Sequence, residues 1–138
     1  MAILQLDHIA IAVDDLPEGI RRFCEDMGLA LEGTEDVVPA QTTTAFIPVG
    51  ETRIELIHPI DGQGPVQKYL EKRGPGLHHI CFRTDDIVGD MERLTAKGYR
   101  FLTDGPTPGA HGTKTAFIHP KSAGGVLIEL AEHPQGGH

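Results

Sequence analysis

Two stretches of the chain alternate between bulky apolar residues and small or polar ones. In the first, from Leu6 to Val13, three branched residues share one face of an extended chain, and His8 shares the other face with two alanines. The second, from Leu77 to Thr84, alternates in the same way and places His79 opposite to its bulky apolar side chains. This period of two predicts a β-strand in each stretch.

Each predicted strand is followed by apolar residues at helical spacing. They lie between Leu16 and Met27 in the first half of the chain and between Ile87 and Leu94 in the second half. Asp15, with Glu18 three residues later, resembles a capping box at the start of the first helix. Gly28 provides a stop signal at its end. We therefore predict one helix after each strand.

Short β-type segments separated by glycine and proline follow both helices. They read TTAFIPV and TRIELI in the first half, and YRFLT, KTAFIH and GVLIEL in the second. The segment from Pro65 to Gly74 reads as a linking helix. We predict a single α+β domain over residues 1–138, with modules of about sixty residues that are not stable alone (about 4–60 and about 76–133) and a linking helix at about 65–73.

The two halves are also related by sequence. When His8 is aligned with His79, at an offset of 71 residues, LDHI meets LHHI and two copies of TAFI meet each other. Two copies of IEL follow in the same order, at an offset of 74 residues. Several matches in one order indicate an internal repeat. We expect the two modules to pack together, with their sheets curving around a shared cleft.

Four residues with metal-binding side chains occupy equivalent places in this repeat. Alternation puts one histidine on the non-core face of each first strand and one glutamate on the non-core face of each last strand. Any one of them alone is more often a surface or hydrogen-bonded residue, but their recurrence favours a metal site. Two imidazoles and two carboxylates suit Co²⁺, Mn²⁺, Ni²⁺, Fe²⁺ or Zn²⁺ and leave positions for water or substrate. The predicted ligands are His8, Glu55, His79 and Glu129.

Five other histidines are not predicted to take part in chemistry. We expect His78 to be structural, or to donate a hydrogen bond near the site. His133 and His138 lie in a C-terminal segment that we expect to fray. His58 and His119 have no equivalent in the repeat and are interpreted as ordinary polar residues.

The composition limits the classes of binding partner and the cellular location that we expect. A formal net charge of -8 disfavours non-specific binding to nucleic acid or to an anionic membrane. The apolar runs are too short to cross a bilayer, and the N-terminus lacks the pattern of a signal peptide. Two cysteines make neither a disulfide framework nor a cysteine-rich zinc motif. We therefore expect a cytoplasmic protein with a small-molecule partner.

The motifs resemble the vicinal oxygen chelate superfamily and, within it, the methylmalonyl-CoA epimerases. The resemblance covers nearly the whole chain and rests on LDHIAIAVDDL, IPVGETRIELIHPI, YLEKRGPGLHHI, PGAHG and HPKSAGGVLIELAEHP. It implies two paired βαβββ modules that form a curved mixed sheet around a metal cleft, and often a homodimer. The ligands of that family fall on the four residues selected above, and Co²⁺ is the metal that the resemblance favours.

The resemblance also implies the reaction, which interconverts (2R)- and (2S)-methylmalonyl-CoA, an acyl-CoA of propionate metabolism, through a metal-stabilised enolate. Glu129 is the expected base on one side of the substrate. Thr43 stands where some relatives carry a second glutamate, so the second acid/base group stays open, with Gln41, a water or Glu55 as alternatives. Lys114 matches a basic position of the family and is expected to meet the substrate carboxylate or a CoA phosphate; a solvated lysine is the alternative.

Other functions remain to be compared with this one. Glyoxalase I, the lactoylglutathione lyase, resembles the chain in fold and ligand set, but HPKSAGGVLIEL and GPGLHHI resemble the epimerases more. A ring-cleaving dioxygenase would use two histidines and one carboxylate around iron. A metal-free binding protein of the same fold would have lost the ligands, and all four are present here. The sequence leaves open whether ethylmalonyl-CoA is also accepted.

Overall fold

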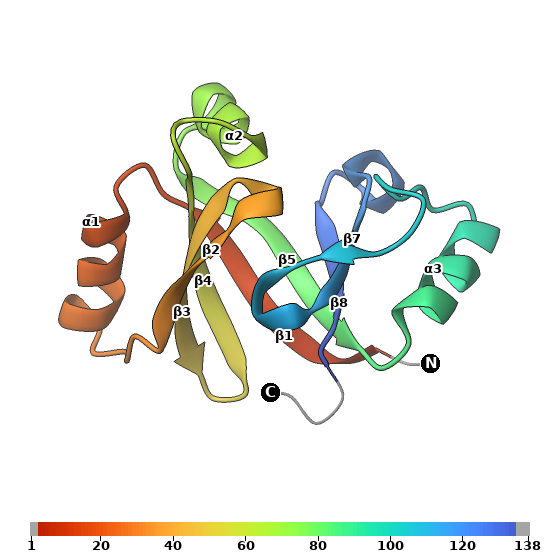
Figure 1. Ribbon diagram of the computed structural model, residues 1–138, viewed down its shortest axis with the longest axis horizontal. Helices are drawn as coiled ribbons and strands as arrows, with labels where there is room; N and C mark the ends of the chain where they lie inside the picture. The colour runs from red at the N-terminus through yellow and green to blue at the C-terminus, as the bar shows by residue number, and fades with distance from the viewer. Residues whose placement is uncertain (1–2, 135–138) are drawn as a thin grey trace. The chain divides into compact units, whose positions relative to one another are not determined.

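A computed structural model describes residues 3–134 of the chain (Figure 1). The chain divides into two compact units. One unit is His8–His78. The other combines the N-terminal residues up to Asp7 with those from His79 onward. The boundary therefore falls within the first strand, whose beginning belongs to the unit that contains the C-terminal half.

The predicted helices and strands occur in the expected order, with two exceptions given below, β2 and YRFLT. The helices are α1 (Leu16–Ile20), α2 (Pro65–Arg73) and α3 (Ile87–Ala96). The strands are β1 (Ile3–Ala12), β2 (Gly33–Val37), β3 (Thr42–Val49), β4 (Thr52–Pro59), β5 (Gly76–Thr84), β6 (Thr107–Pro108), β7 (Lys114–Ile118) and β8 (Ile128–Glu132). A π-helical segment, Arg21–Asp26, continues α1, and short 3₁₀ turns lie at Val38–Ala40, Ala110–Gly112 and Pro120–Ala123.

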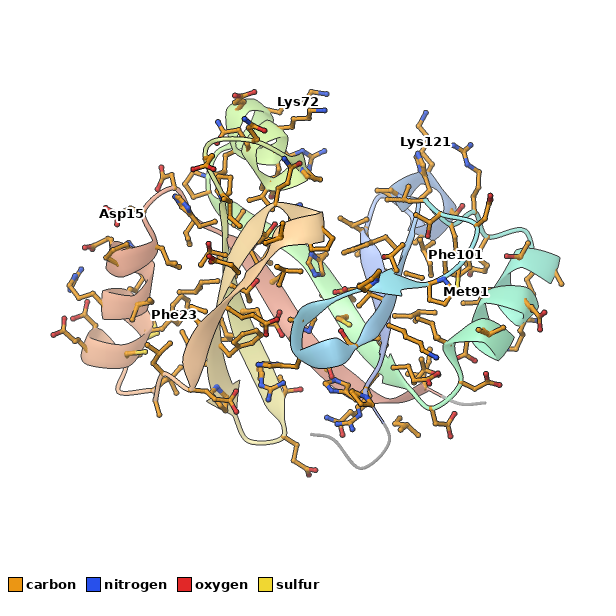
Figure 2. All side chains as sticks on the ribbon, in the orientation of Figure 1. Asp15, Phe23, Lys72, Met91, Phe101 and Lys121 are labelled. Carbon is orange, nitrogen blue, oxygen red and sulfur yellow. The ribbon has the colours of Figure 1, made fainter. Side chains whose placement is uncertain are left out.

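The unit His8–His78 contains a mixed sheet in the order β2-β3-β4-β1, with antiparallel pairs except for the parallel pair of β4 and β1. Helix α1 covers one face, where Phe23 turns toward the strands (Figure 2). Its core there is the buried cluster Val13, Ala45, Ile47 and Leu56. Helix α2 packs on the opposite face, where Val66 contacts Ala10, Ala12 and Ile57. The small side chains of the β1 alanines allow α2 to pack close to the sheet.

The other unit repeats this arrangement with β5-β8-β7-β6, in which β5 and β8 are parallel and the remaining pairs antiparallel. Helix α3 covers one face and buries Ile87 and Met91 against Ala116 and Leu130. Figure 2 shows Met91 and Phe101 on the side of α3 that faces the strands. Each unit is thus a strand and a helix followed by three strands, which confirms the predicted α+β class and its two βαβββ modules.

Local structure differs from the sequence prediction in three places. The first helix is α-helical only to Ile20 and then widens, since the N–H of Met27 bonds to the carbonyl of Arg22. The predicted strand YRFLT forms one isolated bridge, from Phe101 to Ile118. Asp104-Gly105-Pro106 follows, and the strand pairing with β7 resumes at β6. Strand β2 was not predicted.

The starts of α1 and α3 are each capped by an aspartate. The side chain of Asp15 accepts a hydrogen bond from the N–H of Glu18, 3.1 Å away, as the capping box predicts. Asp86 accepts one from the N–H of Gly89 over the same distance of 3.1 Å. Within residues 3–134, no helix has the length and apolar character needed to cross a bilayer.

Candidate functional site

The first predicted pair of ligands comes together in the unit His8–His78. Strand β4 runs parallel to β1, so Glu55 lies opposite Ala10, two residues after His8 on the same face. The Nδ1 atom of His8 is 3.1 Å from an oxygen of the Glu55 carboxylate. The two residues are 7% and 8% exposed. Parallel pairing therefore buries an imidazole and a carboxylate side by side.

The second pair forms the same arrangement in the other unit. Strand β8 runs parallel to β5, and Glu129 lies opposite Cys81, two residues after His79. The Nε2 atom of His79 is 2.9 Å from Oε1 of Glu129, and the two side chains are 8% and 10% exposed. The four predicted ligands therefore lie on the strand faces that alternation predicts. Each histidine is paired with one glutamate.

A phenylalanine from the repeated segment TAFI lies beside each pair. Phe46 on β3 is opposite Glu55, and Phe117 on β7 is opposite Glu129. The ring of Phe117 meets the ring of His79 edge-on, with centroids 5.0 Å apart and an interplanar angle of 87°. This contact limits the orientation of the imidazole. The two copies of the internal repeat thus share the same strand register next to each histidine–glutamate pair.

The donor chemistry of the two pairs fits a divalent metal ion. Nitrogen and oxygen ligands bind first-row ions at about 2.1 Å, and two such ligands at a right angle are about 3.0 Å apart. The two nitrogen–oxygen distances, 3.1 and 2.9 Å, match that separation. Each pair combines an imidazole, which suits these ions, with a carboxylate that offsets positive charge. Each pair therefore fits a shared divalent ion in its donor types and spacing, and the same spacing is that of a hydrogen bond between the imidazole and the carboxylate.

Thr43, the position where the resemblance puts a second glutamate in some relatives, faces away from the predicted metal ligand of its own sheet, Glu55. The hydroxyl of Thr43 donates to the carboxylate of Asp36 at 2.7 Å, and Thr43 lies opposite His58, on the face away from Glu55. Thr44, which is 4% exposed, lies on the face of Glu55 because it is two residues from Phe46. Counting alternate positions back from Phe46 along TTTAF would have found Thr44 from the sequence.

Lys114 lies apart from the polar pair of its unit. It is exposed at the start of β7 and stands opposite Glu132, on the face that carries Ala116 and Leu130. Glu129 projects from the opposite face of β8. The register therefore separates Lys114 from the side of the sheet that carries the His79 and Glu129 pair.

Two further histidines have structural partners. The ring of His78 meets the ring of Tyr69 edge-on at 4.8 Å, consistent with the predicted structural role. His133, by contrast, was expected to fray, and that prediction is wrong. Its side chain is 5% exposed, and its Nε2 atom lies 2.6 Å from the carboxylate of Asp7. The prediction failed because a contact between the two ends of the chain leaves no local pattern; His138 lies outside the described residues.

Comparisons with known proteins agree with these features. The family model described as the Glyoxalase/Bleomycin resistance protein/Dioxygenase superfamily matches residues 7–117. The chain is 37% identical over 133 residues to the mitochondrial methylmalonyl-CoA epimerase of Dictyostelium discoideum, covering 96% of this chain and 80% of that protein. It is 38% identical over 130 residues to the ethylmalonyl-CoA/methylmalonyl-CoA epimerase of Cereibacter sphaeroides, covering 93% and 97%.

A solved methylmalonyl-CoA epimerase in complex with methylmalonyl-CoA and NH₄⁺ has a TM-score of 0.93 at 31% identity, covering 99% of both chains. A probable lactoylglutathione lyase of Vibrio parahaemolyticus is less similar, at 29% identity over 130 residues, covering 93% of this chain and 90% of that protein. The chain therefore belongs to the Glyoxalase/Bleomycin resistance protein/Dioxygenase superfamily and, within it, to the family of the methylmalonyl-CoA epimerases.

Proposed function

We propose that the protein is a metal-dependent epimerase that interconverts (2R)- and (2S)-methylmalonyl-CoA. The observation that carries this proposal is the duplicated histidine–glutamate pair, buried and in equivalent register in both modules. Relatives that bear this name match over nearly the whole chain. The lower identity to a lactoylglutathione lyase favours this function over glyoxalase I.

In this proposal the two pairs converge on one divalent ion, with His8, Glu55, His79 and Glu129 as its protein ligands. The equivalence of the pairs supports it, because an ion between two related modules would take the same two residues from each. The two carboxylates would cancel the formal charge of the ion. Co²⁺ is the metal that we propose, on the basis of the family resemblance.

The substrate chemistry suits such a centre. The C2 proton of methylmalonyl-CoA lies between a thioester and a carboxylate, so its removal leaves a delocalised enolate. When bound, the ion would supply positive charge that stabilises the enolate oxygen. Glu129 would remove the proton from one side of C2 and return it there in the reverse direction. Burial of Glu129 keeps bulk water from competing for that proton.

Four more specific properties are part of this proposal: a substrate contact, an oligomeric state, a cellular location and a metabolic role. Lys114 would bind a CoA phosphate, since its register favours the rim of the module over the metal-facing side. We also propose that the protein is a homodimer, is cytoplasmic and acts in propionate metabolism. Sedimentation at micromolar concentration tests the dimer. A Lys114→Ala variant tests the phosphate contact, because it should raise KM for the CoA thioester while leaving kcat unchanged.

Proton NMR of methylmalonyl-CoA in D₂O tests the main proposal. We expect the C2 proton to be lost with the purified protein, lost far more slowly after chelation, and lost again at the original rate after reconstitution with Co²⁺. Ethylmalonyl-CoA in the same assay tests the wider substrate range that the name of the Cereibacter relative indicates. A fully metallated sample that exchanges no C2 proton but converts the hemithioacetal of methylglyoxal would replace this function with glyoxalase I.

A further inference from the structure

The proposed function leaves one chemical requirement unmet. Inversion at C2 needs a proton removed from one side of the carbon and delivered to the other. One carboxylate on one side can exchange the proton with solvent, but it cannot reach the opposite side. If Glu129 serves one side, a second acid/base group must serve the other.

Thr43, Gln41 and Thr44 do not supply that group. Thr43 lies on the far face of β3, bonded to Asp36. The side-chain amide of Gln41 donates to Gln63 at 3.4 Å, and an amide is neither acid nor base near neutral pH. Thr44 lies on the correct face, but a hydroxyl is far too weak a base to remove this proton on its own.

Strand register identifies a different carboxylate. In the sheet of the unit His8–His78, Glu55 is opposite Phe46, and Thr44 is two residues before Phe46 on the same face. Glu35 on β2 is directly opposite Thr44. Paired residues of antiparallel strands project from the same side, so Glu35 projects from the face that carries Glu55.

The positions that share the Glu55 face of this sheet can be read from the register. On β1 they are His8, Ala10 and Ala12; on β2, Gly33, Glu35 and Val37; on β3, Thr42, Thr44, Phe46 and Pro48; and on β4, Arg53, Glu55, Ile57 and Pro59. Among these described positions, the carboxylates are Glu55 and Glu35. Glu35 is the one of these two outside the predicted ligand set, so a bound ion would not lower its basicity.

Glu35 and its neighbour on β2, Asp36, differ in solvent exposure. Glu35 is half-buried, whereas Asp36 is exposed and lies on the opposite face. A half-buried carboxylate can exchange its proton with solvent between turnovers and still be shielded during the reaction.

We propose that Glu35 is the second acid/base residue of the epimerase, an inference that rests on the proposed function. In one direction the Glu129 carboxylate takes the C2 proton, and the electrons of the broken C–H bond pass into the enolate. The Glu35 carboxylic acid then gives its proton to the opposite side of C2, which forms the new C–H bond and leaves Glu35 ionised. In the reverse direction the two residues exchange roles, and each returns to its starting state by exchanging a proton with water.

Separate assays of the two epimers in D₂O test this assignment. With Glu35→Gln, we expect inversion to fall by about 10²–10⁴-fold. Exchange of the C2 proton should persist within about tenfold of the wild-type rate for the epimer that Glu129 deprotonates, and should be lost for the other epimer. A purely structural role would slow both epimers alike. Asp36→Asn is the matched control on the same strand and should change neither rate.

Rescue makes the test more specific. In the Glu35→Gln background, Thr44→Glu places a carboxylate on the same face, one strand nearer to Glu55, and we expect inversion to recover at least about tenfold. Wild-type inversion by Glu35→Gln would overturn the assignment, as would equal loss of exchange for both epimers with an unchanged metal content. Absence of C2 exchange in the wild-type protein would instead overturn the proposed function.

Discussion

An oxygen of the Asp7 carboxylate lies 2.6 Å from Nε2 of His133, and 126 positions of the chain separate the two residues. Both side chains are buried, at 7% and 5% exposure. The other ring nitrogen of His133 is also buried and has no hydrogen-bond partner within the described residues. This pair ties the start of β1 to the segment after β8, so the residues up to Asp7 belong to the unit of the C-terminal half.

Loss of His133 should destabilise that unit. His133→Ala removes one hydrogen-bond partner of the buried Asp7 carboxylate, and we expect the free energy of unfolding to fall by about 1–3 kcal/mol. His133→Gln keeps a side-chain N–H donor and should lose less. Urea denaturation monitored by circular dichroism measures both values, with the exposed Asp104→Asn as control. A His133→Ala value equal to that of the control would mean that the pair contributes little.

The two ligand glutamates should differ when each is changed to glutamine. An amide oxygen can still coordinate a metal ion but cannot accept the C2 proton, so Glu129→Gln should lower kcat by about 10²–10⁴-fold. Glu55→Gln should retain metal and lose less than about tenfold, because no proton transfer is assigned to Glu55. Metal content by elemental analysis and initial rates distinguish the two effects. Equal loss of kcat in the two variants would contradict the assignment of Glu129 as base.

The edge-on contact between Phe117 and His79 should support metal binding. Phe117→Leu keeps the apolar volume but removes the ring contact, which is worth about 0.5–1.5 kcal/mol. We therefore expect Co²⁺ to bind up to about tenfold more weakly, since the imidazole loses part of its orientation. The matched variant Phe46→Leu changes the equivalent residue of the other TAFI segment. Isothermal titration with Co²⁺ measures both, and unchanged affinity in Phe117→Leu would remove this role.

The cap of α3 should not tolerate a side chain at Gly89. A Cβ atom at this position would clash with Oδ2 of Asp86, the residue that caps the helix. Although alanine is the better helix former, Gly89→Ala should therefore destabilise the protein by about 1 kcal/mol or more, the value of a lost cap. Gly105→Ala, with nothing within 4 Å of the added Cβ, is the control. Thermal unfolding would contradict the clash if Gly89→Ala melted at or above the control.

Much of the candidate site could be predicted from the sequence because strand alternation is local. His8, Glu55, His79 and Glu129 each stand on an apolar strand whose period of two fixes the face of the side chain. The internal repeat then identified the four as equivalent. The structure adds the contacts within each pair, which follow from the parallel pairing of β1 with β4 and of β5 with β8.

The features that the sequence did not predict depended on pairing between strands and on contacts between distant segments. Strand β2 carries an acidic, weakly apolar sequence, so no local pattern marked it, and only its register with β3 puts Glu35 opposite Thr44. His133 lies in a polar, glycine-rich tail, yet it is buried because Asp7 lies beside it in the fold. The sequence by itself determined which residues share a face of a strand, because the backbone period requires it. The tertiary structure decided which faces and chain ends meet, because that depends on register and on packing between residues far apart in the chain.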